Sequence, residues 1–251
     1  MPLLEVRGLV KRFFGVTALD AVDLHVEAGE LVSLIGPNGS GKTTLFNCVT
    51  GYLAADCGRV LLRGRDVTGV AAHRIARLGI GRTFQLATVF PRLSALDNLL
   101  TFLQQHQEDH FGARLIRSPR VRALERVAVE RAQILLASVG LAAKADALAG
   151  TLSYGQRKLL AFAGALMSDP DLLLLDEPAA AVSPAMIEQM KEQIRVLHRA
   201  GKTVLLVEHN MDVVMDISER VVVLDYGRKI AEGPPGLIRR DPLVIEAYFG
   251  R

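Results

Sequence analysis

The stretch GPNGSGKTT, residues 36–44, has the residue types and spacing to bind a nucleotide. It fits the pattern G-x-x-x-x-G-K-[ST], lying after an apolar run and before a helix-like segment. Glycines let successive backbone N–H groups curl around phosphate oxygens, and the following helix adds the positive end of its dipole. Lys42 can then reach the β- and γ-phosphates, while the Thr43 hydroxyl suits Mg²⁺. The predicted phosphate-binding residues are Gly36, Pro37, Asn38, Gly39, Ser40, Gly41, Lys42, Thr43 and Thr44.

Acidic and polar residues after other apolar runs could complete a hydrolytic site. In LLLLDEP, we expect Asp176 to bind Mg²⁺ and Glu177 to polarise an attacking water. Gln85, in GIGRTFQ, could contact the metal or the water through its amide oxygen. His209, after VLLVE, could hydrogen-bond a γ-phosphate. On spacing alone, an ordinary surface role for Gln85 and a structural role for His209 stay open.

The stretch LSYGQRKLL, which begins at Leu152, is a second polar loop followed by an apolar segment. Its pattern predicts the start of a helix. It also gathers the hydrogen-bonding groups of Ser153, Gly155 and Gln156 in one loop. The pattern alone does not show what these groups would bind.

Three continuous apolar runs, ELVSLIG, DLLLLDE and TVLLVEH, predict parallel strands buried on both faces. Helical patterns flank each run, which favours a β–α–β core. The first quarter of the chain instead alternates apolar and polar residues, as expected of short antiparallel strands. RVVVLDYGRKIAEG predicts a hairpin that turns at Tyr226 and Gly227. These elements indicate an α/β fold.

The middle of the chain, from about residue 84 to 150, has a helical pattern and few strand signals. Ser118 and Pro119 predict the start of a helix that Gly140 ends. Its predicted apolar face is Val121, Leu124, Ala128, Leu135 and Val139. A later helix is predicted between Ser183 and Gly201, with the stripe Ile187, Met190, Ile194 and Leu197. We therefore expect a helical lobe inserted into the α/β core.

Composition excludes several classes of function. The 251 residues carry a net charge of +3, with 30 Lys and Arg against 27 Asp and Glu. This balance is too even for a protein that binds nucleic acid irrespective of sequence. Cys48 and Cys57 have no zinc-like spacing and suit a reduced, cytosolic chain. The longest apolar run is too short to span a membrane, so we expect any membrane association to be peripheral.

Taken in order, these motifs resemble those of the ATP-binding cassette (ABC) family over nearly the whole chain. GPNGSGKT is similar to its Walker A loop, Gln85 to its Q-loop, LSYGQ to its signature, LLLLDE to its Walker B strand and His209 to its switch histidine. The resemblance implies ATP and Mg²⁺ as cofactors. Phe13 matches the aromatic that stacks on adenine, although a buried strand aromatic is the alternative.

The resemblance also implies an architecture: an α/β P-loop NTPase with a RecA-like core, an N-terminal antiparallel β-subdomain and an inserted helical subdomain. We expect one domain over residues 1–251, with the RecA-like and β core at 1–84 and 157–251. The helical subdomain, with the Q-loop and signature, would be residues 85–156.

ABC ATPases work as head-to-tail pairs, in which one domain's signature contacts the nucleotide on the other's phosphate loop. By this resemblance, Ser153 and Gly155 would donate a hydroxyl and a backbone N–H to a γ-phosphate. Gln156 would support the loop. Two residues depart from the commonest pattern: Tyr154 stands where many members have Gly, and Ser183 where many have Asp.

GIGRTFQ, LSYGQRK, DEPAAAVSP, VEHNMDVVM and VIEAYFG are similar to segments of the LivG-type ATPases of branched-chain amino-acid importers, although Ala181 replaces a usual Gly. This implies as partners membrane permease subunits, a second ABC ATPase subunit, identical or paralogous, and a periplasmic or extracellular solute-binding protein, with no nucleic acid. The implied location is cytoplasmic, peripheral on the inner face of the membrane.

Three other functions are alternatives to this one. The first is the ATPase of a urea or short-chain amide importer, whose sequence is closely related. The second is a non-transport ABC ATPase acting on nucleic acid, but such proteins typically carry two cassettes, and this chain has one phosphate loop. The third, a metabolic kinase, does not explain why LSYGQ precedes the acidic strand end.

Overall fold

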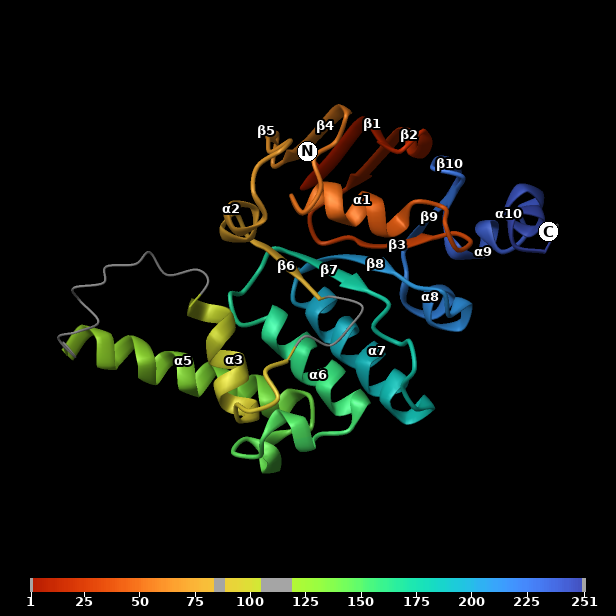
Figure 1. Cartoon of the computed structure of the whole chain (residues 1–251). Helices are drawn as coiled ribbons and strands as arrows, with labels where there is room; N and C mark the ends of the chain where they lie inside the picture. Colours follow the sequence, from red (N-terminus) through yellow and green to blue (C-terminus); the bar gives the residue numbers. More distant parts are fainter. Residues whose placement is uncertain (1, 84–88, 105–118, 250–251) are drawn as a thin grey trace.

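The chain folds around two β-sheets with helices packed on both sides of the larger one (Figure 1). The computed structural model describes residues 2–83, 89–104 and 119–249. The smaller sheet has the strand order β2-β1-β4-β5 and the larger one β10-β9-β3-β8-β7-β6. The strands are β1 (Leu4–Phe13), β2 (Val16–Val26), β3 (Leu31–Ile35), β4 (Cys57–Leu62), β5 (Arg65–Asp66), β6 (Ile80–Arg82), β7 (Leu172–Asp176), β8 (Thr203–Val207), β9 (Arg220–Asp225) and β10 (Arg228–Gly233).

The larger sheet confirms the prediction from the apolar runs. Every residue of β3, β7 and β8 is buried, as expected for strands covered on both faces. These strands, with β6 and β9, pair in parallel, and β10 closes one edge antiparallel to β9. Parallel pairing brings the carboxyl ends of β3, β7 and β8 to one edge, where the predicted functional residues follow.

Both predicted antiparallel regions are present. In the smaller sheet, β1 pairs with β2 on one side and β4 on the other. The hairpin of β9 and β10 turns at Tyr226 and Gly227, whose φ angles are 43° and 76°. Two consecutive positive φ angles are characteristic of the tight turns that match the twist of a hairpin. The smaller sheet packs over α1 (Lys42–Val49), and together they form one core with a face of the larger sheet (Figure 1).

A second core lies on the opposite face of the larger sheet and joins the helices of the middle region to it. Leu99, Leu136, Leu160 and Met190 meet there with apolar side chains from β7 and β8. The remaining helices, including two 3₁₀ turns, are α2 (Ala72–Arg77), α3 (Ala95–Gln104), α5 (Pro119–Ser138), η1 (Ala142–Lys144), η2 (Ala149–Thr151), α6 (Tyr154–Ala165), α7 (Pro184–Arg199), α8 (Met211–Ile217), α9 (Pro235–Ile238) and α10 (Pro242–Phe249). Within the described ranges, no helix combines the length and apolar character needed to cross a bilayer.

The apolar face predicted for α5 is partly wrong. Leu124 is 56% exposed, whereas Ala132, Leu136 and Val139 are buried. Figure 1 shows the cause, because the N-terminal half of α5 projects beyond α3 and α6, and no other helix of the described residues lies beside it. Val121 is in the helix, but its side chain lies outside the described part. The stripe predicted for α7 is confirmed, with Met190 and Ile194 buried in the second core.

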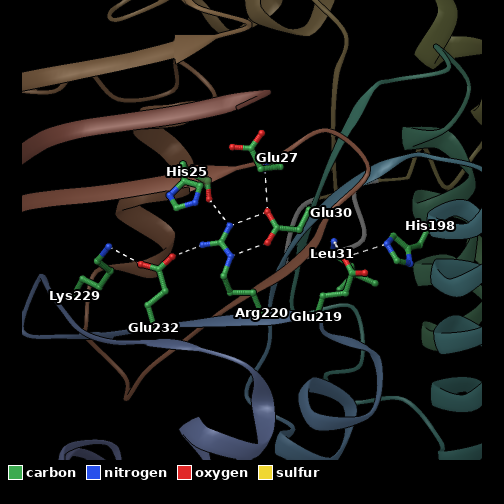
Figure 2. Close-up of polar contacts among 9 residues, drawn as sticks. All are labelled: His25, Glu27, Glu30, Leu31, His198, Glu219, Arg220, Lys229 and Glu232. Atoms are coloured by element: carbon green, nitrogen blue, oxygen red, sulfur yellow. Dashed lines mark hydrogen bonds and ion pairs between the residues drawn. The ribbon is translucent and has the colours of Figure 1, made fainter. Parts of the chain in front are cut away.

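Arg220, the first residue of β9, connects the two sheets at the end of β3 remote from the phosphate loop (Figure 2). Its Nε and Nη2 contact the two carboxylate oxygens of Glu30 at 2.6 and 2.7 Å. It also pairs with Glu232 and donates to the carbonyl oxygen of His25 at 2.8 Å. One guanidinium thus ties the end of β2 and the turn before β3 to β9 and β10.

Candidate nucleotide-binding and hydrolysis site

The glycine-rich loop connects β3 to α1, as the sequence predicted, and its backbone tolerates only glycine at two points. A Cβ on Gly36, where φ is 151°, would lie 2.1 Å from the carbonyl oxygen of Leu224. A Cβ on Gly41, where φ is 103°, would lie 2.5 Å from that of Ala18. These glycines allow the loop to pass close to neighbouring backbone.

Lys42 reaches back across its own loop and is almost fully buried. Its Nζ donates to the carbonyl oxygens of Gly36 and Pro37, both at 2.8 Å, and to Ser40 Oγ at 3.2 Å. Burial lowers the pKa of Lys42, and the nearby carboxylates of Glu177 and Asp176 oppose that shift. The ammonium group therefore lies inside a turn of backbone amides, an arrangement suited to phosphate oxygens.

The rest of the loop presents its polar groups outward. Asn38, Gly39 and Thr43 are exposed, and Thr44 is half-buried in the first turn of α1. Ser40 is buried, and its carbonyl oxygen accepts from the backbone N–H of Gly227 at 3.0 Å. The loop is thus held against the β9–β10 turn while its open side stays accessible.

Asp176 ends β7 and is buried beside Arg82, which ends β6. Arg82 Nη2 lies 3.2 Å from Asp176 Oδ2. Burial raises the pKa of Asp176 despite the opposing charge of Arg82. Arg82 also donates to Thr50 Oγ1 at 2.6 Å and lies over the ring of Tyr52, its Cζ 5.5 Å from the ring centroid. The sequence did not single out Arg82, because its partners are distant along the chain.

Glu177 and His209 come together at the carboxyl ends of β7 and β8. His209 Nε2 lies 2.9 Å from Glu177 Oε1. Glu177 has a φ of 48°, and its N–H donates to the carbonyl oxygen of Val207 at 2.9 Å. The structure therefore brings together two residues that the sequence predicted as catalytic. Gln85, the third, lies outside the described residues.

Glu208 is a site residue that sequence reasoning missed. It is 2% exposed, and its carboxylate accepts from the backbone N–H of Ala179 at 2.6 Å. The same carboxylate accepts from the N–H groups of His209 and Asn210 at 3.0 and 3.2 Å. Glu208 thus joins the loop after β8 to the loop after β7. A charged residue that continues an apolar strand was the available signal.

The polar loop at residue 153 begins α6, as predicted. Ser153 Oγ accepts from the N–H of Gln156 at 3.2 Å, while Gln156 Oε1 accepts from the N–H of Ser153 at 3.1 Å. This reciprocal cap leaves the hydroxyl hydrogen of Ser153 available to donate. A Cβ on Gly155 would lie 2.4 Å from Met186 Sδ. In the described part of the chain, no hydrogen bond or ion pair joins this loop to residues 36–44.

Phe13 ends β1 and is 36% exposed, so the alternative interpretation of Phe13 as a buried strand aromatic is wrong. Lys11 Nζ lies 5.4 Å from the centroid of its ring. Phe14 is fully exposed in the following turn, at a φ of 45°. The ring of Phe13 is therefore partly available for stacking.

A parallel sheet with a glycine-rich loop, a buried acid and a Glu–His pair at one edge defines a P-loop nucleotide-binding ATPase. Residues 19–180 match the family model described as "ABC transporter". Residues 228–251 match a second model, "Branched-chain amino acid ATP-binding cassette transporter". The chain belongs to the ABC transporter family, as an ATP-binding subunit that hydrolyses ATP.

Similarity to known members extends over the full length. The chain is 44% identical over 250 residues to the high-affinity branched-chain amino acid transport ATP-binding protein BraF of Pseudomonas aeruginosa, covering 99% of this chain and 98% of BraF. It is 40% identical to LivG of Escherichia coli, described by the same transport function, with the same coverage. The solved ADP conformation of MJ1267, an ATP-binding cassette of an ABC transporter, has a TM-score of 0.85 and 33% identity, and each chain is fully covered.

Proposed function

We propose that this chain is the ATP-hydrolysing subunit of an importer for branched-chain amino acids. The observation that carries the cargo assignment is similarity over the whole length to BraF and LivG, together with the C-terminal match at residues 228–251. The contact between Glu177 and His209 supports the hydrolytic assignment. ATP binding would close two ATPase subunits on each other, and hydrolysis would let them open.

Residues 36–44 would hold the phosphates of ATP, with Lys42 exchanging its carbonyl partners for phosphate oxygens. A charged acceptor makes a stronger hydrogen bond than a carbonyl, which favours this exchange. Phe13 would stack on the adenine through its exposed ring face. These roles agree with the loop geometry, in which the backbone encircles the ammonium group.

The oxygen ligands at the strand ends fit Mg²⁺. Asp176 supplies a buried carboxylate and Thr43 an exposed hydroxyl next to Lys42, and Mg²⁺ prefers such hard oxygens. Burial raises the pKa of Asp176 despite the charge of Arg82, and a divalent cation beside the carboxylate would favour its ionised form. Gln85 is proposed as a further ligand on the sequence alone. Bound Mg²⁺ would neutralise charge on the β- and γ-phosphates.

Glu177 would act as the general base that takes a proton from the attacking water. Its carboxylate lies beside the imidazole of His209, with Oε1 2.9 Å from Nε2. His209 would orient this carboxylate and contact the γ-phosphate. A base needs to lie within hydrogen-bond reach of the proton that it removes, and a fixed carboxylate meets that requirement.

The loop at Ser153 would complete the site of a second ATPase subunit. Ser153 keeps a hydroxyl hydrogen to donate, and α6 points the positive end of its dipole outward at the same place. Gln156 holds the loop through the reciprocal cap. A solved dimeric ABC cassette, MJ0796, has a TM-score of 0.78 and 26% identity to this chain. The second subunit would be an identical chain or a paralogue.

The permease would dock where the helical region meets the larger sheet. A cavity of about 190 Å³ lies there, between α2, β6, α3 and α6. Its lining includes Tyr52, Thr83, Phe90, Thr101, Phe102 and Ser168. Phe90 is half exposed, and the buried amide of Asn98 holds its backbone through N–H and carbonyl contacts of 2.7 and 3.0 Å. An anchored aromatic beside a cavity suits a permease helix.

We propose a division into a core, residues 1–84 and 157–251, and a helical subdomain, residues 85–156, and residues of both parts line this cavity. Docking to a permease would place the chain in the cytoplasm, peripheral on the inner face of the membrane. An extracytoplasmic solute-binding protein would deliver the amino acid to the permease.

Transport in reconstituted vesicles tests the proposal. The full chain, its permease partners and a second ATPase are combined with purified solute-binding protein, and uptake of leucine, isoleucine and valine is compared with uptake of urea and acetamide. We expect ATP-dependent uptake of the branched-chain amino acids. Uptake of urea or acetamide alone would instead assign the chain to the related amide importers. ATP turnover stimulated by DNA or RNA, and not by permease in lipid, would overturn the transport function.

A further inference from the structure

Lys158 is a buried lysine on α6 that the assignments above do not use. Lys158 is 6% exposed and comes less than two helical turns after Ser153. Its Nζ donates to the carbonyl oxygen of Glu177 at 2.8 Å and to that of Ala180 at 2.7 Å. Burial lowers the pKa of Lys158, although the carboxylates of Glu208, Glu177 and Asp176 oppose the shift. A buried ammonium group is costly unless its donors are used, and here two acceptors belong to one turn.

The turn that Lys158 contacts holds Glu177 in a strained conformation. The φ of Glu177 is 48°, a left-handed value that a residue other than glycine keeps only when its surroundings fix it. Part of that support comes from the β8 side, through the carbonyl oxygen of Val207 and the carboxylate of Glu208. Lys158 supplies support from the opposite side, because it reaches the turn from α6.

The surroundings leave the side chain of Lys158 little freedom. A cavity of about 10 Å³ beside it is lined by Asp176, Phe162, Pro178 and Met190 among others. That space is no larger than one water molecule requires. The ring of Tyr154 also lies near the ammonium group, with its centroid 5.7 Å from Nζ. An aromatic face at this distance attracts a cation.

We propose that Lys158 is a positioning residue for hydrolysis, which fixes the peptide of Glu177 so that the Glu177 carboxylate faces His209. The same contacts fasten the turn to the helix that Ser153 caps. Displacement of the start of α6 by a partner's nucleotide would therefore move the carbonyl partners of Lys158 and, with them, Glu177. Tyr154 would cover the ammonium group that makes this connection. This inference rests on the proposed role of Glu177 as general base.

The test replaces Lys158 by Met in the full chain, because Met keeps the length of the side chain and matches its apolar surroundings. We expect kcat for ATP to fall by about tenfold or more, while KM and the affinity for a non-hydrolysable ATP analogue stay within about twofold. The matched control is Lys191→Met. Lys191 is also buried, at 8% exposure, but it pairs with Glu188 of α7 and Asp216 of α8. The Lys191→Met substitution should lower Tm and leave kcat within about twofold of the native value.

The split between kcat and KM separates positioning from general support of the fold. Native kcat in Lys158→Met would overturn the inference, as would a loss of nucleotide affinity equal to the loss of kcat. If Lys158→Met does not fold, Lys158→Gln takes its place with the same expectations. Glu177→Gln is measured in parallel. If it turns over ATP at the native rate, the base assignment fails and the inference with it, whereas an inactive Glu177→Gln beside a native Lys158→Met rejects only the positioning role.

Discussion

His209 Nε2 lies 2.9 Å from Oε1 of Glu177, although the two residues belong to loops on separate strands. The register of the larger sheet explains this contact. Asp176, the last residue of β7, pairs with Val207, the last residue of β8, so the loops that follow leave the sheet side by side. The buried carboxylate of Glu208 then joins the two loops through backbone N–H groups. The result is a close contact between the two side chains at the carboxyl edge of the sheet.

Replacing Glu177 by Gln should stop hydrolysis and preserve ATP binding. The amide keeps the shape of the side chain and its contact with His209 but cannot take a proton from water. We expect kcat to fall by about 10²–10⁴-fold, the range usual for loss of a general base, and an ATP-bound dimer to accumulate. Single-turnover kinetics and size-exclusion chromatography with ATP measure both effects. Glu192→Gln, an exposed substitution on α7, serves as the control, and native turnover by Glu177→Gln would show that another group removes the proton.

Ser153→Arg should separate nucleotide binding from turnover. Ser153 makes no described contact with the phosphate loop of its own chain, so ATP affinity of the monomer should stay native. The long, charged arginine side chain would block the surface that is proposed to meet a second subunit. We therefore expect turnover to be abolished. Fluorescent-nucleotide titration and ATPase assays test this. The control is Ser138→Arg on the exposed end of α5, and weakened monomer binding in Ser153→Arg alone would place this residue outside the composite site.

Local sequence patterns predicted the elements that position this site. The runs that form β3, β7 and β8 are continuous and apolar because both faces of the sheet are covered. Strands of this kind can therefore be predicted from the sequence alone. The helix starts at Ser153 and at Ser183–Pro184 were equally visible, since helix starts depend on neighbouring residues. The function of the loop at Ser153, however, came from the resemblance to a family and not from its pattern.

The contacts that sequence reasoning missed join residues that lie far apart along the chain. Lys158 contacts a turn about twenty residues away, and Arg82 pairs with Asp176 across two adjacent strands. Neither has a local pattern that distinguishes it from an ordinary surface cation. The error at Leu124 has the same origin, because helical periodicity identifies an apolar face but not whether another element covers it.

Gly36→Ala should abolish tight nucleotide binding by distorting the phosphate loop. The new Cβ would lie 2.1 Å from the carbonyl oxygen of Leu224, and backbone cannot move away as a flexible side chain would. We expect ATP affinity to fall by at least about tenfold, with a lower Tm. Gly39→Ala is the matched comparison, since φ there is also positive, at 79°, but no atom lies within 4 Å of the added Cβ. A loss in Gly39→Ala as large as that in Gly36→Ala would mean that backbone strain, and not the clash, determines affinity.

Arg220, Glu30 and Glu232 form a cluster of ion pairs (Figure 2). This cluster makes the stability of the fold depend on pH. Burial alone would raise the pKa of Glu30, but hydrogen bonds from Arg220 and the N–H of Glu27 outweigh it and hold the pKa below its ordinary value of 4.5. The pKa of Glu232 is lowered in the same way, with burial outweighed by Lys229 and Arg220. A carboxylate with a lowered pKa binds fewer protons in the folded state than in the unfolded state. Its stabilisation is therefore present above pH 4.5 and is lost as the pH falls through the folded-state pKa.

Arg220→Met should lower the free energy of unfolding by about 2–3 kcal/mol at pH 7, because it leaves two partly buried carboxylates without their shared cation. As the pH falls below 4.5, protonation of Glu30 and Glu232 removes the charges that Arg220 stabilises, so the difference from the native chain should shrink. Urea unfolding at several pH values measures this. Arg7→Met, which removes an exposed pair with Glu5, should change the pH profile much less, because solvent screens that pair. A difference between Arg220→Met and the native chain that stays constant with pH would show that Arg220 acts through packing and not through the two carboxylates.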